Sequence, residues 1–404
     1  MNKDRTVVLS QRVQAIKPSP TLAVTAHAAR LKAQGKDIIG LGAGEPDFDT
    51  PRHIKDAAIG AINSGFTKYT PVAGTASLKQ AIIRKFKRDN GLDYQPGQIL
   101  VSCGGKQSFF NLVQALIDPG DQVVIPAPYW VSYPDIVILA GGEPVFVEAG
   151  IAQGFKITPQ QLRDAITPKT RLVVLNSPSN PTGAVYTPEE LTGLGEVLRA
   201  HPGVLIASDD MYEHILLSEQ PFSNILNACP DLYPRTVVLN GVSKAYSMTG
   251  WRIGYAAGPE PLITAMENVQ SQSTSNATSI SQVAAEAALN GDQGCIEPML
   301  AAFRERHRFV VDRLNEIPGV RCLPSGGAFY AFPEVGQAIE KLRARGVVSD
   351  SSDVTLSEYL LEQAGVAVVP GSAFGSEGYI RLSFATSMEN LKLALERIHK
   401  ALTA

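Results

Sequence analysis

Side chains and glycines that could do chemistry follow directly after four short apolar runs of this 404-residue chain. The four groups are Gly104, Gly105 and Lys106; Asn180; Asp209 with Tyr212; and Ser243 with Lys244. If the runs are parallel strands, their carboxyl ends meet at one edge of a sheet, which is where ligands of such sheets bind. The convergence of the four groups predicts a single site at that edge, and it is more informative than any one residue.

Lys244 is the residue that we single out most firmly. It follows an apolar run and begins a segment rich in small and aromatic residues, KAYSMTGWRIGY. Most lysines are exposed surface cations, but burial here would lower the pKa of the ammonium and make the neutral amine available for a Schiff base. Arg252, eight residues further on, suits a phosphate because its guanidinium can donate to two oxygens.

The glycine pair could hold the anion. Gly104 and Gly105 would let backbone N–H groups at a helix N-terminus approach a phosphate, where the helix dipole also favours negative charge. A tight strand-to-helix turn is the plainer interpretation of two glycines alone. The segment is not a P-loop, since no Gly lies five residues before Gly105 and no Ser or Thr follows Lys106.

Asp209, Tyr212 and Asn180 have specific tasks if the ligand is a pyridoxal ring. A carboxylate beside the pyridine nitrogen keeps it protonated, so that the ring can accept electrons; otherwise Asp209 is a helix N-cap. Tyr212 would lie on the same side as Asp209 if a helix begins there. Asn180 could bind a ring oxygen, or it could merely cap the loop before Pro181.

The elements that must position these groups alternate along the middle of the chain. Short β-branched runs between amphipathic segments are typical of a mostly parallel sheet buried on both faces. The runs are Ile99–Ser102, Val123–Ile125, Val145–Val147, Leu172–Leu175, Val204–Ala207, Val237–Leu239 and Ile253–Ala256. Helical spacing from Phe109 to Ile117 predicts a helix that ends at Asp118-Pro119-Gly120-Asp121. We therefore expect an α/β fold with a large domain whose sheet is sandwiched by helices.

The pattern changes beyond residue 298. Apolar residues at helical spacing from Phe303 to Ile317 predict a helix, and Gly326–Phe332 and Tyr379–Ala385 are predicted as strands before a terminal helix from Ser387. This predicts a smaller α+β domain over residues 299–404. Residues 50–298 would form the large domain, and residues 1–49 an N-terminal arm and part of the small domain.

Bulk properties favour a cytoplasmic protein that acts on small molecules. The net charge of −3 gives no footprint for nucleic acid or an anionic membrane. The first residues, MNKDRTVVLSQRVQ, lack the apolar core of a secretory signal, and no run approaches the roughly 18 apolar residues of a membrane span. The four cysteines are scattered, and the six histidines include no HxxxH pair, so we expect reduced thiols and no metal site.

Several segments in one order carry a resemblance to a known family. They are LGAGEPDFDTP, GFTKYTPVAGTASLKQAI, GGKQ, APYWVSYP, NSPSNPTG, SDDMYEHI, SKAYSMTGWRIGY, GGAFY and YIRLSFA. From about Arg12 onward the chain resembles class I aminotransferases, and more narrowly the bacterial aspartate aminotransferases that include aspartate/prephenate aminotransferases. The resemblance implies a homodimer with shared active sites that binds pyridoxal 5'-phosphate, an amino acid and a 2-oxo acid.

The resemblance also implies a role for each matching residue. Lys244 would be the Schiff-base lysine and proton shuttle, with Ser243 beside it. The other implied cofactor contacts are Gly104, Gly105, Lys106 and Arg252 at the phosphate, Asp209 at the pyridine nitrogen, Tyr212 and Asn180 at the ring oxygen, Trp130 stacked near the ring, and Tyr69 reaching the neighbouring subunit's phosphate. The implied substrate contacts are Arg381 and Gly44 at the α-carboxylate, together with Trp130 and Asn180.

Two basic residues bear on the substrate. The apolar residues Ile380, Leu382 and Phe384 alternate with polar ones, which predicts that Arg381 points away from the core and can take a carboxylate bidentately; the alternative is a surface salt bridge. Lys17 lies where some family members engage a second substrate carboxylate, but it could equally be a surface lysine.

We expect an aminotransferase with ping-pong kinetics, in which L-aspartate donates its amino group and 2-oxoglutarate or prephenate accepts one. Two alternatives keep the same scaffold: a preference for aromatic or other amino acids, and a β-lyase reaction. A regulator built on an aminotransferase domain is a third class, but this chain has no basic segment for DNA.

Overall fold

A seven-stranded sheet forms the centre of the larger domain. The structure, a computed structural model, describes residues 7–18 and 20–403. The strand order is β2-β8-β7-β6-β5-β3-β4. The strands are β2 (Ile99–Ser102), β3 (Gln122–Ala127), β4 (Glu143–Glu148), β5 (Thr170–Asn176), β6 (Leu205–Asp209), β7 (Thr236–Gly241) and β8 (Gly254–Ala257). β8 runs antiparallel to β2 and β7, and the other pairs are parallel, which confirms the predicted sheet.

Alternate residues of these strands face two separate hydrophobic cores. In β5, Val173 and Leu175 join one core, whereas Leu172 and Val174 join the other. All four are fully or nearly fully buried. Both faces are therefore covered, which is why these strands are apolar throughout rather than alternating with polar residues.

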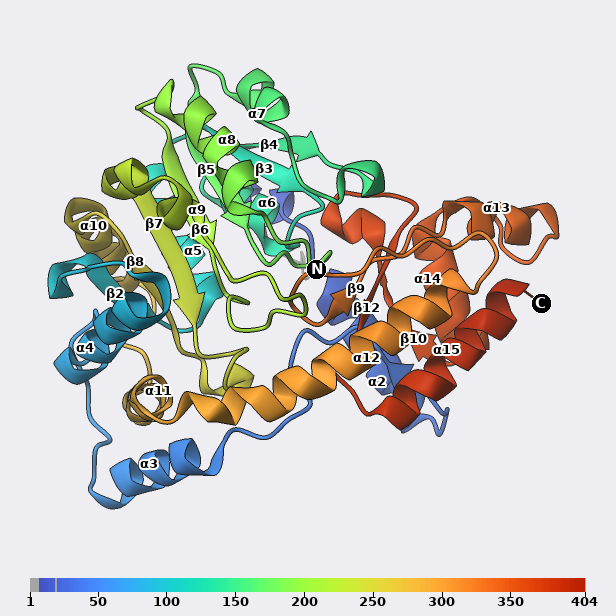
Figure 1. The fold of residues 1–404 in the computed structure, drawn as a ribbon, viewed down its shortest axis with the longest axis horizontal. Helices are drawn as coiled ribbons and strands as arrows, with labels where there is room; N and C mark the ends of the chain where they lie inside the picture. Colours follow the sequence, from blue (N-terminus) through green and yellow to red (C-terminus); the bar gives the residue numbers. More distant parts are fainter. Residues whose placement is uncertain (1–6, 19, 404) are drawn as a thin grey trace, which may run out of the picture.

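Helices cover each face of the sheet (Figure 1). On one face, buried residues come from α5 (Gly105–Leu116), α6 (Ser132–Leu139) and α10 (Glu260–Ser271). On the other face they come from α4 (Ala76–Lys85), α7 (Pro159–Ala165), α8 (Pro188–Arg199), α9 (Ile225–Ala228) and α11 (Ser279–Asn290). α5 begins at the predicted glycine pair and ends before Asp118-Pro119-Gly120, as predicted.

The remaining elements form the smaller α+β domain and the connections to it. α13 (Gly336–Ala344), α14 (Asp353–Gln363) and α15 (Met388–Thr403) gather at the end of the molecule opposite α4 and β2, and α12 (Glu297–Asn315) runs from beside α11 to this end (Figure 1). They accompany an antiparallel sheet in the order β11-β12-β9, made of β11 (Val369–Pro370), β12 (Ile380–Ser383) and β9 (Tyr330–Ala331). The predicted limits of the domains stay predictions, and Pro298 lies in the first turn of α12.

The N-terminal segment packs partly with this smaller group. β1 (Ile39–Gly40) pairs in parallel with β10 (Val366–Ala367). The helices of this segment are α1 (Gln11–Ala15), α2 (Pro20–Ala33) and α3 (Arg52–Asn63). Among the helices over residues 7–18 and 20–403, none combines the length and apolarity required to cross a bilayer.

Short helical segments complete the connections. They are the π-helical η1 (Phe86–Asn90) and the 3-10 segments η2 (Pro96–Gln98), η3 (Ile151–Gln153), η4 (Pro230–Arg235), η5 (Thr249–Trp251), η6 (Gln293–Ile296) and η7 (Gly371–Phe374). η5 lies between Lys244 and β8, and Arg252 follows it directly, two residues before β8 begins.

The predicted strand over Gly326–Phe332 is wrong in most of its length. Only β9 is regular, because the preceding residues bond to loops of the large domain instead of to a neighbouring strand. The N–H groups of Gly326 and Gly327 both donate to the carbonyl of Gly183, and Ala328 donates to Ile215 with φ at +58°. This connection places the start of β9 against the large domain.

Candidate active site

A cavity of about 420 Å³ lies where the carboxyl ends of β5, β6 and β7 meet the smaller domain. Its walls come from α2, the segment before α3, the starts of α5 and α6, the ends of the central strands, the segment around η5, and β9 with β12. Most of the predicted site residues line it. They are Gly44, Gly105, Lys106, Trp130, Asn180, Asp209, Tyr212, Ser243, Lys244, Arg252 and Arg381.

Lys244 is buried in this cavity. Its ammonium donates to the carbonyl oxygen of Gly44 at 2.5 Å and lies 5.8 Å from the centre of the Tyr212 ring. Burial lowers the pKa of Lys244 to about 8, and the charges of Arg381 and Arg252 lower it further, against the opposing effect of Glu45. Near neutral pH, part of the protein molecules therefore carry Lys244 as a neutral nucleophile.

An anion cradle lies at the N-terminus of α5. Gly104 has φ at +86°, and a Cβ atom there would collide with the guanidinium of Arg252. Arg252 donates to the carbonyls of Thr249 at 2.9 Å and Cys103 at 3.3 Å, so its charge is held without a carboxylate partner. Gly104 itself stands behind Arg252 instead of lining the cavity. Backbone N–H groups at a helix N-terminus and the guanidinium of Arg252 suit a phosphate.

Lys106 projects from the first turn of α5 towards Trp130. Its ammonium lies 5.4 Å from the ring centre of Trp130. Burial lowers the pKa of Lys106, and the nearby charge of Arg252 lowers it further. The described structure gives this ammonium no carboxylate within ion-pair distance, so it is available to an anion in the cavity.

Asp209 stands at the end of β6, with a phenol behind it. Its Oδ2 accepts a hydrogen bond from the hydroxyl of Tyr133, and its Oδ1 accepts one from the N–H of Met211 at 3.3 Å. A turn rather than an α-helix follows, so Asp209 is no helix N-cap and the helical placement of Tyr212 was wrong. The turn still brings both side chains to the cavity. Burial raises the pKa of Asp209, so a cationic N–H placed here would stabilise its charged form.

Arg381 is buried, which corrects our expectation that it points away from the core. Its side chain is only 2% exposed, and every residue of β12 is buried. Its two terminal nitrogens donate to Asn180 Oδ1 at 2.8 Å and to the carbonyl of Gly42 at 2.7 Å, whereas Nε has no partner. The alternation of apolar residues did not mark an exposed face, because the cavity wall and the smaller core cover the two faces of this strand. Nε is thus the one guanidinium nitrogen that the described residues leave without an acceptor.

Besides Gly104, two predicted residues lie outside the cavity. Tyr69 is 93% exposed and contributes nothing to the site of its own chain. Lys17 lines a neighbouring cavity of about 770 Å³ that shares Val131 with the first, and its backbone N–H donates to Asp135. Their predicted roles stay predictions.

Comparison with known proteins agrees with this geometry. The family model described as aminotransferase class I and II matches residues 36–398. The chain belongs to this family. It is 70% identical to the aspartate/prephenate aminotransferase of Nitrosomonas europaea over 395 residues, which cover 98% of this chain and 100% of that protein. It is 53% identical to the aspartate aminotransferase of Geobacillus stearothermophilus, over 98% of this chain and 99% of that one.

Solved structures of aspartate aminotransferases share the fold. The enzyme from Rhizobium meliloti superposes with a TM-score of 0.93 at 47% identity, covering 98% of this chain and 99% of that one. The Thermus thermophilus enzyme with maleate superposes with a TM-score of 0.91 at 45% identity, covering 98% and 100%. The chain is therefore an aminotransferase with a large domain built on a mostly parallel sheet and a smaller α+β domain.

Sequence analysis missed three residues of this aminotransferase site. Tyr133 lies in the first turn of α6, 76 positions from the Asp209 that it contacts, and no local pattern marks it. Tyr330 follows the quoted glycines but was treated as strand core. Asn176 was quoted in a motif without a role; its side chain donates to the carbonyl of Asp209 at 3.0 Å and accepts from the N–H of Asn180 at 2.9 Å. Asn176 thus ties the ends of β5 and β6 together.

A buried ion pair supports the turn that carries Asp209 and Tyr212. Lys85 and Glu213 are 1% and 3% exposed in their side chains, and they are in direct contact. The amide of Asn240 donates to the same carboxylate at 2.7 Å. Burial raises the pKa of Glu213, but the contacts with Lys85, His214 and Asn90 together outweigh this effect, so the pKa is lowered overall.

The same ion pair accounts for a group of possible metal ligands. Asp89, Glu213 and His214 bring their ligand atoms within 4.8 Å of one another. The ammonium of Lys85 contacts Glu213 and lies 3.8 Å from Asp89, so a cation already stands between the two carboxylates. The group is a compensated charge network behind the active site.

Replacement of Lys85 by Met should destabilise the enzyme strongly. The carboxylate of Glu213 would be left buried without its cation, which costs about 3–5 kcal/mol. The free energy of unfolding, measured by urea denaturation followed by circular dichroism, should fall by that amount. Lys85→Met combined with Glu213→Leu should recover part of the loss, because no unpaired charge then remains.

The matched control is the exposed pair Arg199–Asp231, whose nitrogen and oxygen are 2.7 Å apart in the same domain. Arg199→Met should cost less than about 1 kcal/mol, since water screens the pair. Equal losses for Lys85→Met and Arg199→Met would show that the buried pair does not hold the turn.

Proposed function

We propose that this aminotransferase binds pyridoxal 5'-phosphate covalently on Lys244 and transfers an amino group between L-aspartate and 2-oxoglutarate or prephenate. The observation that carries the proposal is a partly buried amine of lowered pKa, Lys244, that shares one cavity with a partly buried carboxylate, Asp209, and a buried guanidinium, Arg381. When bound, the cofactor supplies a ring that accepts electrons from the substrate Cα.

The residues present fit that cofactor. The anion cradle of Gly104, Gly105 and Arg252 would hold its phosphate, and Ser243 beside Lys244 offers a hydroxyl to the same cavity. Asp209 would face its ring nitrogen, since a buried carboxylate of raised pKa is stabilised by a cationic N–H. Tyr212 and Asn180 would face its ring oxygen, and Trp130 would cover the ring.

The side chains of this chain then divide the work of the reaction. Arg381 binds the substrate α-carboxylate with its charge and its unpartnered Nε, while Gly44 lines the same end of the cavity. Lys244 Nζ would accept the proton from the substrate Cα and would deliver it to the cofactor carbon that keeps the amino nitrogen, which is the proton shift that amino transfer requires. Exclusion of water from the closed cavity would favour transfer over side reactions. A second half-reaction with another 2-oxo acid restores the starting state, which predicts ping-pong kinetics.

Aspartate is the proposed amino donor because one cation of the cavity, Lys106, is not needed for the α-carboxylate or the phosphate. Arg381 serves the α-carboxylate and Arg252 the phosphate, which leaves Lys106 beside Trp130 for the second carboxylate of a dicarboxylic acid. The curated relatives are named aspartate/prephenate and aspartate aminotransferases, which supports the same substrates. Lys17, in the neighbouring cavity, would contact only a longer substrate.

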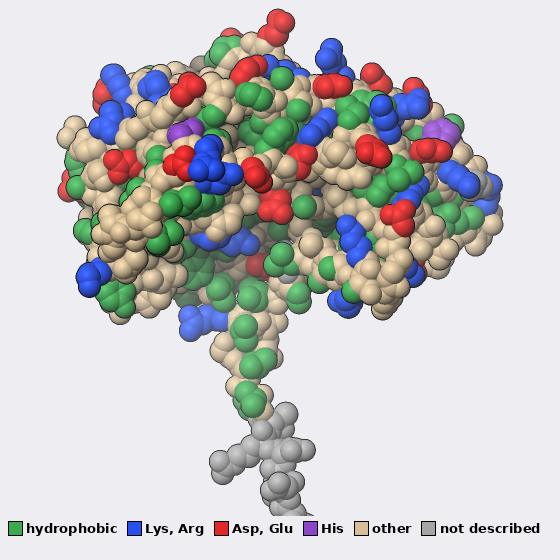
Figure 2. Space-filling model, turned by 90° about the horizontal axis from the view of Figure 1, so that it is seen from below, with side chains coloured by type: hydrophobic (Ala, Val, Ile, Leu, Met, Phe, Trp, Pro, Cys, Tyr) green, Lys and Arg blue, Asp and Glu red, His purple; other side chains and the backbone are tan. Residues whose placement is uncertain are grey.

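We also propose a homodimer in which Tyr69 reaches the partner's cofactor phosphate. Apolar side chains are exposed next to it: Ile59, Ile62 and Phe66 are 39–52% exposed. Figure 2 shows that the segment after the first six residues stands out from the body, and Val7, Val8 and Leu9 along it are exposed. Exposed apolar surface of this kind is typical of an interface.

A cytoplasmic location in amino-acid biosynthesis completes the proposal. The four cysteines are free thiols, two of them buried, as expected for a reducing compartment. Fractionation of cells that produce the protein would test this, and recovery outside the cytoplasmic fraction would contradict it.

The test of the function is an absorption experiment on the purified enzyme loaded with pyridoxal phosphate. L-Aspartate should abolish the visible band of the Lys244-bound cofactor, and 2-oxoglutarate or prephenate should restore it. Lys244→Ala should lack the band and lose nearly all turnover. A band that no amino acid abolishes would mean that the cofactor is right and the reaction wrong, and product formation without an oxo-acid acceptor would favour a β-lyase.

Variants of the substrate groups sharpen the same assay. Arg381→Lys should raise the aspartate concentration for half-maximal loss of the band about 100-fold, because bidentate binding and about 3 kcal/mol are lost. Lys106→Gln should raise this concentration for aspartate but not for alanine, and Lys17→Met should act only on prephenate. Loss of the cofactor in Arg381→Lys would show that this arginine was assigned wrongly.

The pH dependence of cofactor uptake should report the lowered pKa of Lys244. The neutral amine reacts, so the rate of covalent uptake by the cofactor-free protein should rise about tenfold per pH unit below pH 8 and level off above it. An ordinary lysine would keep rising to about pH 10.4. Stopped-flow absorbance between pH 6.5 and 10 measures this rate, and a continued rise beyond pH 9 would contradict the burial argument.

The dimer is tested by Tyr69→Phe. The variant should sediment as a dimer like the wild type but bind pyridoxal phosphate about fivefold more weakly, because about 1 kcal/mol of one hydrogen bond is lost. A wild-type monomer with full activity in analytical ultracentrifugation would overturn the shared active site.

A further inference from the structure

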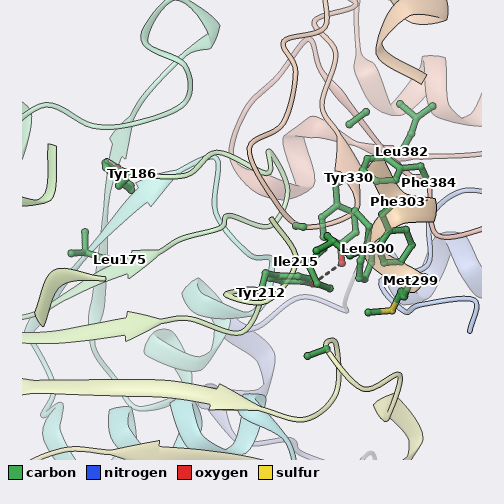
Figure 3. Close-up of a cluster of buried hydrophobic side chains, with 14 of the residues drawn as sticks. Leu175, Tyr186, Tyr212, Ile215, Met299, Leu300, Phe303, Tyr330, Leu382 and Phe384 are labelled. Atoms are coloured by element: carbon green, nitrogen blue, oxygen red, sulfur yellow. Dashed lines mark hydrogen bonds between the residues drawn. The ribbon is translucent and has the colours of Figure 1, made fainter. Parts of the chain in front are cut away.

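Tyr330 is a buried tyrosine that joins the two ends of the cavity. It comes from β9 in the smaller domain, its side chain is fully buried, and it lines the cavity. Its hydroxyl lies 2.7 Å from the hydroxyl of Tyr212, which comes from the turn after β6 (Figure 3). The contact therefore bridges the element that carries Asp209 and the sheet that carries Arg381.

Arg381 packs on the same tyrosine. Its guanidinium carbon is 4.5 Å from the ring centre of Tyr330 and 4.9 Å from that of Phe374, so the charge lies between two aromatic rings. These contacts stabilise the cation and fix its plane. They also place a positive charge beside the phenol of Tyr330, which polarises its O–H bond and makes it the better donor of the two hydroxyls.

The direction of the hydrogen bond follows from the count of protons. Burial raises the pKa of Tyr330 and Tyr212 above that of an ordinary tyrosine, so both phenols keep their protons. Each phenol has one proton to donate, and the other hydroxyl is the sole partner that the described residues give to either of them. If Tyr330 donates, the proton of Tyr212 is left to point into the cavity.

The position of this hydroxyl is fixed from a second side. A Cβ atom on Gly44 would lie 2.9 Å from the Tyr330 hydroxyl oxygen, closer than such atoms approach. The absence of a side chain at residue 44 therefore leaves room for the hydroxyl of Tyr330. The carbonyl of Gly44 also accepts the hydrogen bond from Lys244, so one hydroxyl touches the segments that position Lys244 and Tyr212.

We propose that Tyr330 is a positioning residue for amino transfer: its hydroxyl donates to Tyr212, so that Tyr212 presents its own proton to the ring oxygen of the cofactor. The inference rests on the proposed function, because the acceptor of the Tyr212 proton is the ring oxygen of the proposed cofactor. Through Tyr330, the proposal links Arg381, which binds the substrate carboxylate, to Tyr212, which faces the ring oxygen of the cofactor.

The expected consequence is spectroscopic. A donor at the ring oxygen stabilises negative charge there, and it does so most when the neighbouring cofactor nitrogen is unprotonated. Donation by Tyr212 therefore lowers the pH at which the visible band of the Lys244-bound cofactor changes. Loss of the Tyr330 hydroxyl would misdirect this donation and move the midpoint to higher pH.

The variant Tyr330→Phe removes the hydroxyl and keeps the ring under Arg381. The midpoint of the band should rise by about half a pH unit or more, and the cofactor dissociation constant should rise about threefold to fivefold, as for one weakened hydrogen bond. kcat should fall by a similar factor, while KM for aspartate changes less than twofold. The double variant with Tyr212→Phe should match Tyr212→Phe alone, since the hydroxyl acts only through Tyr212.

The matched control is Tyr186→Phe. Tyr186 is a buried tyrosine that does not line the cavity, and its hydroxyl accepts from the N–H of Ile157 at 3.0 Å. This variant should lose stability but leave the midpoint and the dissociation constant unchanged.

Three results would overturn the inference. The midpoint of Tyr330→Phe could equal that of the wild type, its effects could add fully to those of Tyr212→Phe, or Tyr186→Phe could shift the midpoint equally. A wild-type protein that forms no visible band with pyridoxal phosphate would instead overturn the proposed function itself, so the two failures are distinguishable.

Discussion

The gathering of four cations around one small cavity is the constraint on which the rest of the site depends. Lys106, Lys244, Arg252 and Arg381 all line the same space. Burial lowers the pKa of Lys244 and Arg381, and for Lys244 the charge of Arg381 adds to the effect. This repulsion is tolerable only if anions enter, and a phosphate with one or two carboxylates supplies them. The cavity is thus preorganised for its ligands before they arrive.

The acidic side chains of the turn after β6, apart from Asp209, lie behind the cavity wall. Asp209 faces the cavity, but the next acidic side chains of its turn point the other way, and Glu213 is compensated by Lys85. The buried hydrogen bonds of Asp210 to Ser208 and Asn224 hold the turn from the same side. Two backbone hydrogen bonds close the turn, from the N–H of Glu213 to Asp210 and from the N–H of Ile215 to Tyr212, and these side-chain contacts add to them. A site built on a loop needs such support to keep its side chains in place.

The sequence was sufficient for the sheet and for the groups at its edge, because a parallel sheet covered on both faces leaves apolar runs that few other structures produce. The same logic failed for Arg381. Alternation of apolar and polar residues marks an exposed face only where that face is in contact with water. In β12 the face that carries Arg381 is covered by the cavity wall instead. Tyr133, Tyr330 and Lys85 could not be found from local patterns, since their partners lie 76, 118 and 128 positions away along the chain. Contacts of that kind depend on the packing of whole elements.

The neutrality of the acceptors around Arg381 explains how a buried arginine can still bind an anion. Its nitrogens donate to an amide oxygen of Asn180 and to the carbonyl of Gly42, and its plane rests on two aromatic rings. An internal carboxylate would have satisfied the guanidinium more strongly, but the ion pair would then have to break before a substrate could bind. Dipoles and ring faces stabilise the cation without cancelling its charge. The Arg381 side chain is already ordered when the protein folds. Its attraction to a substrate carboxylate is therefore not reduced by the conformational entropy that ordering the side chain would cost on binding.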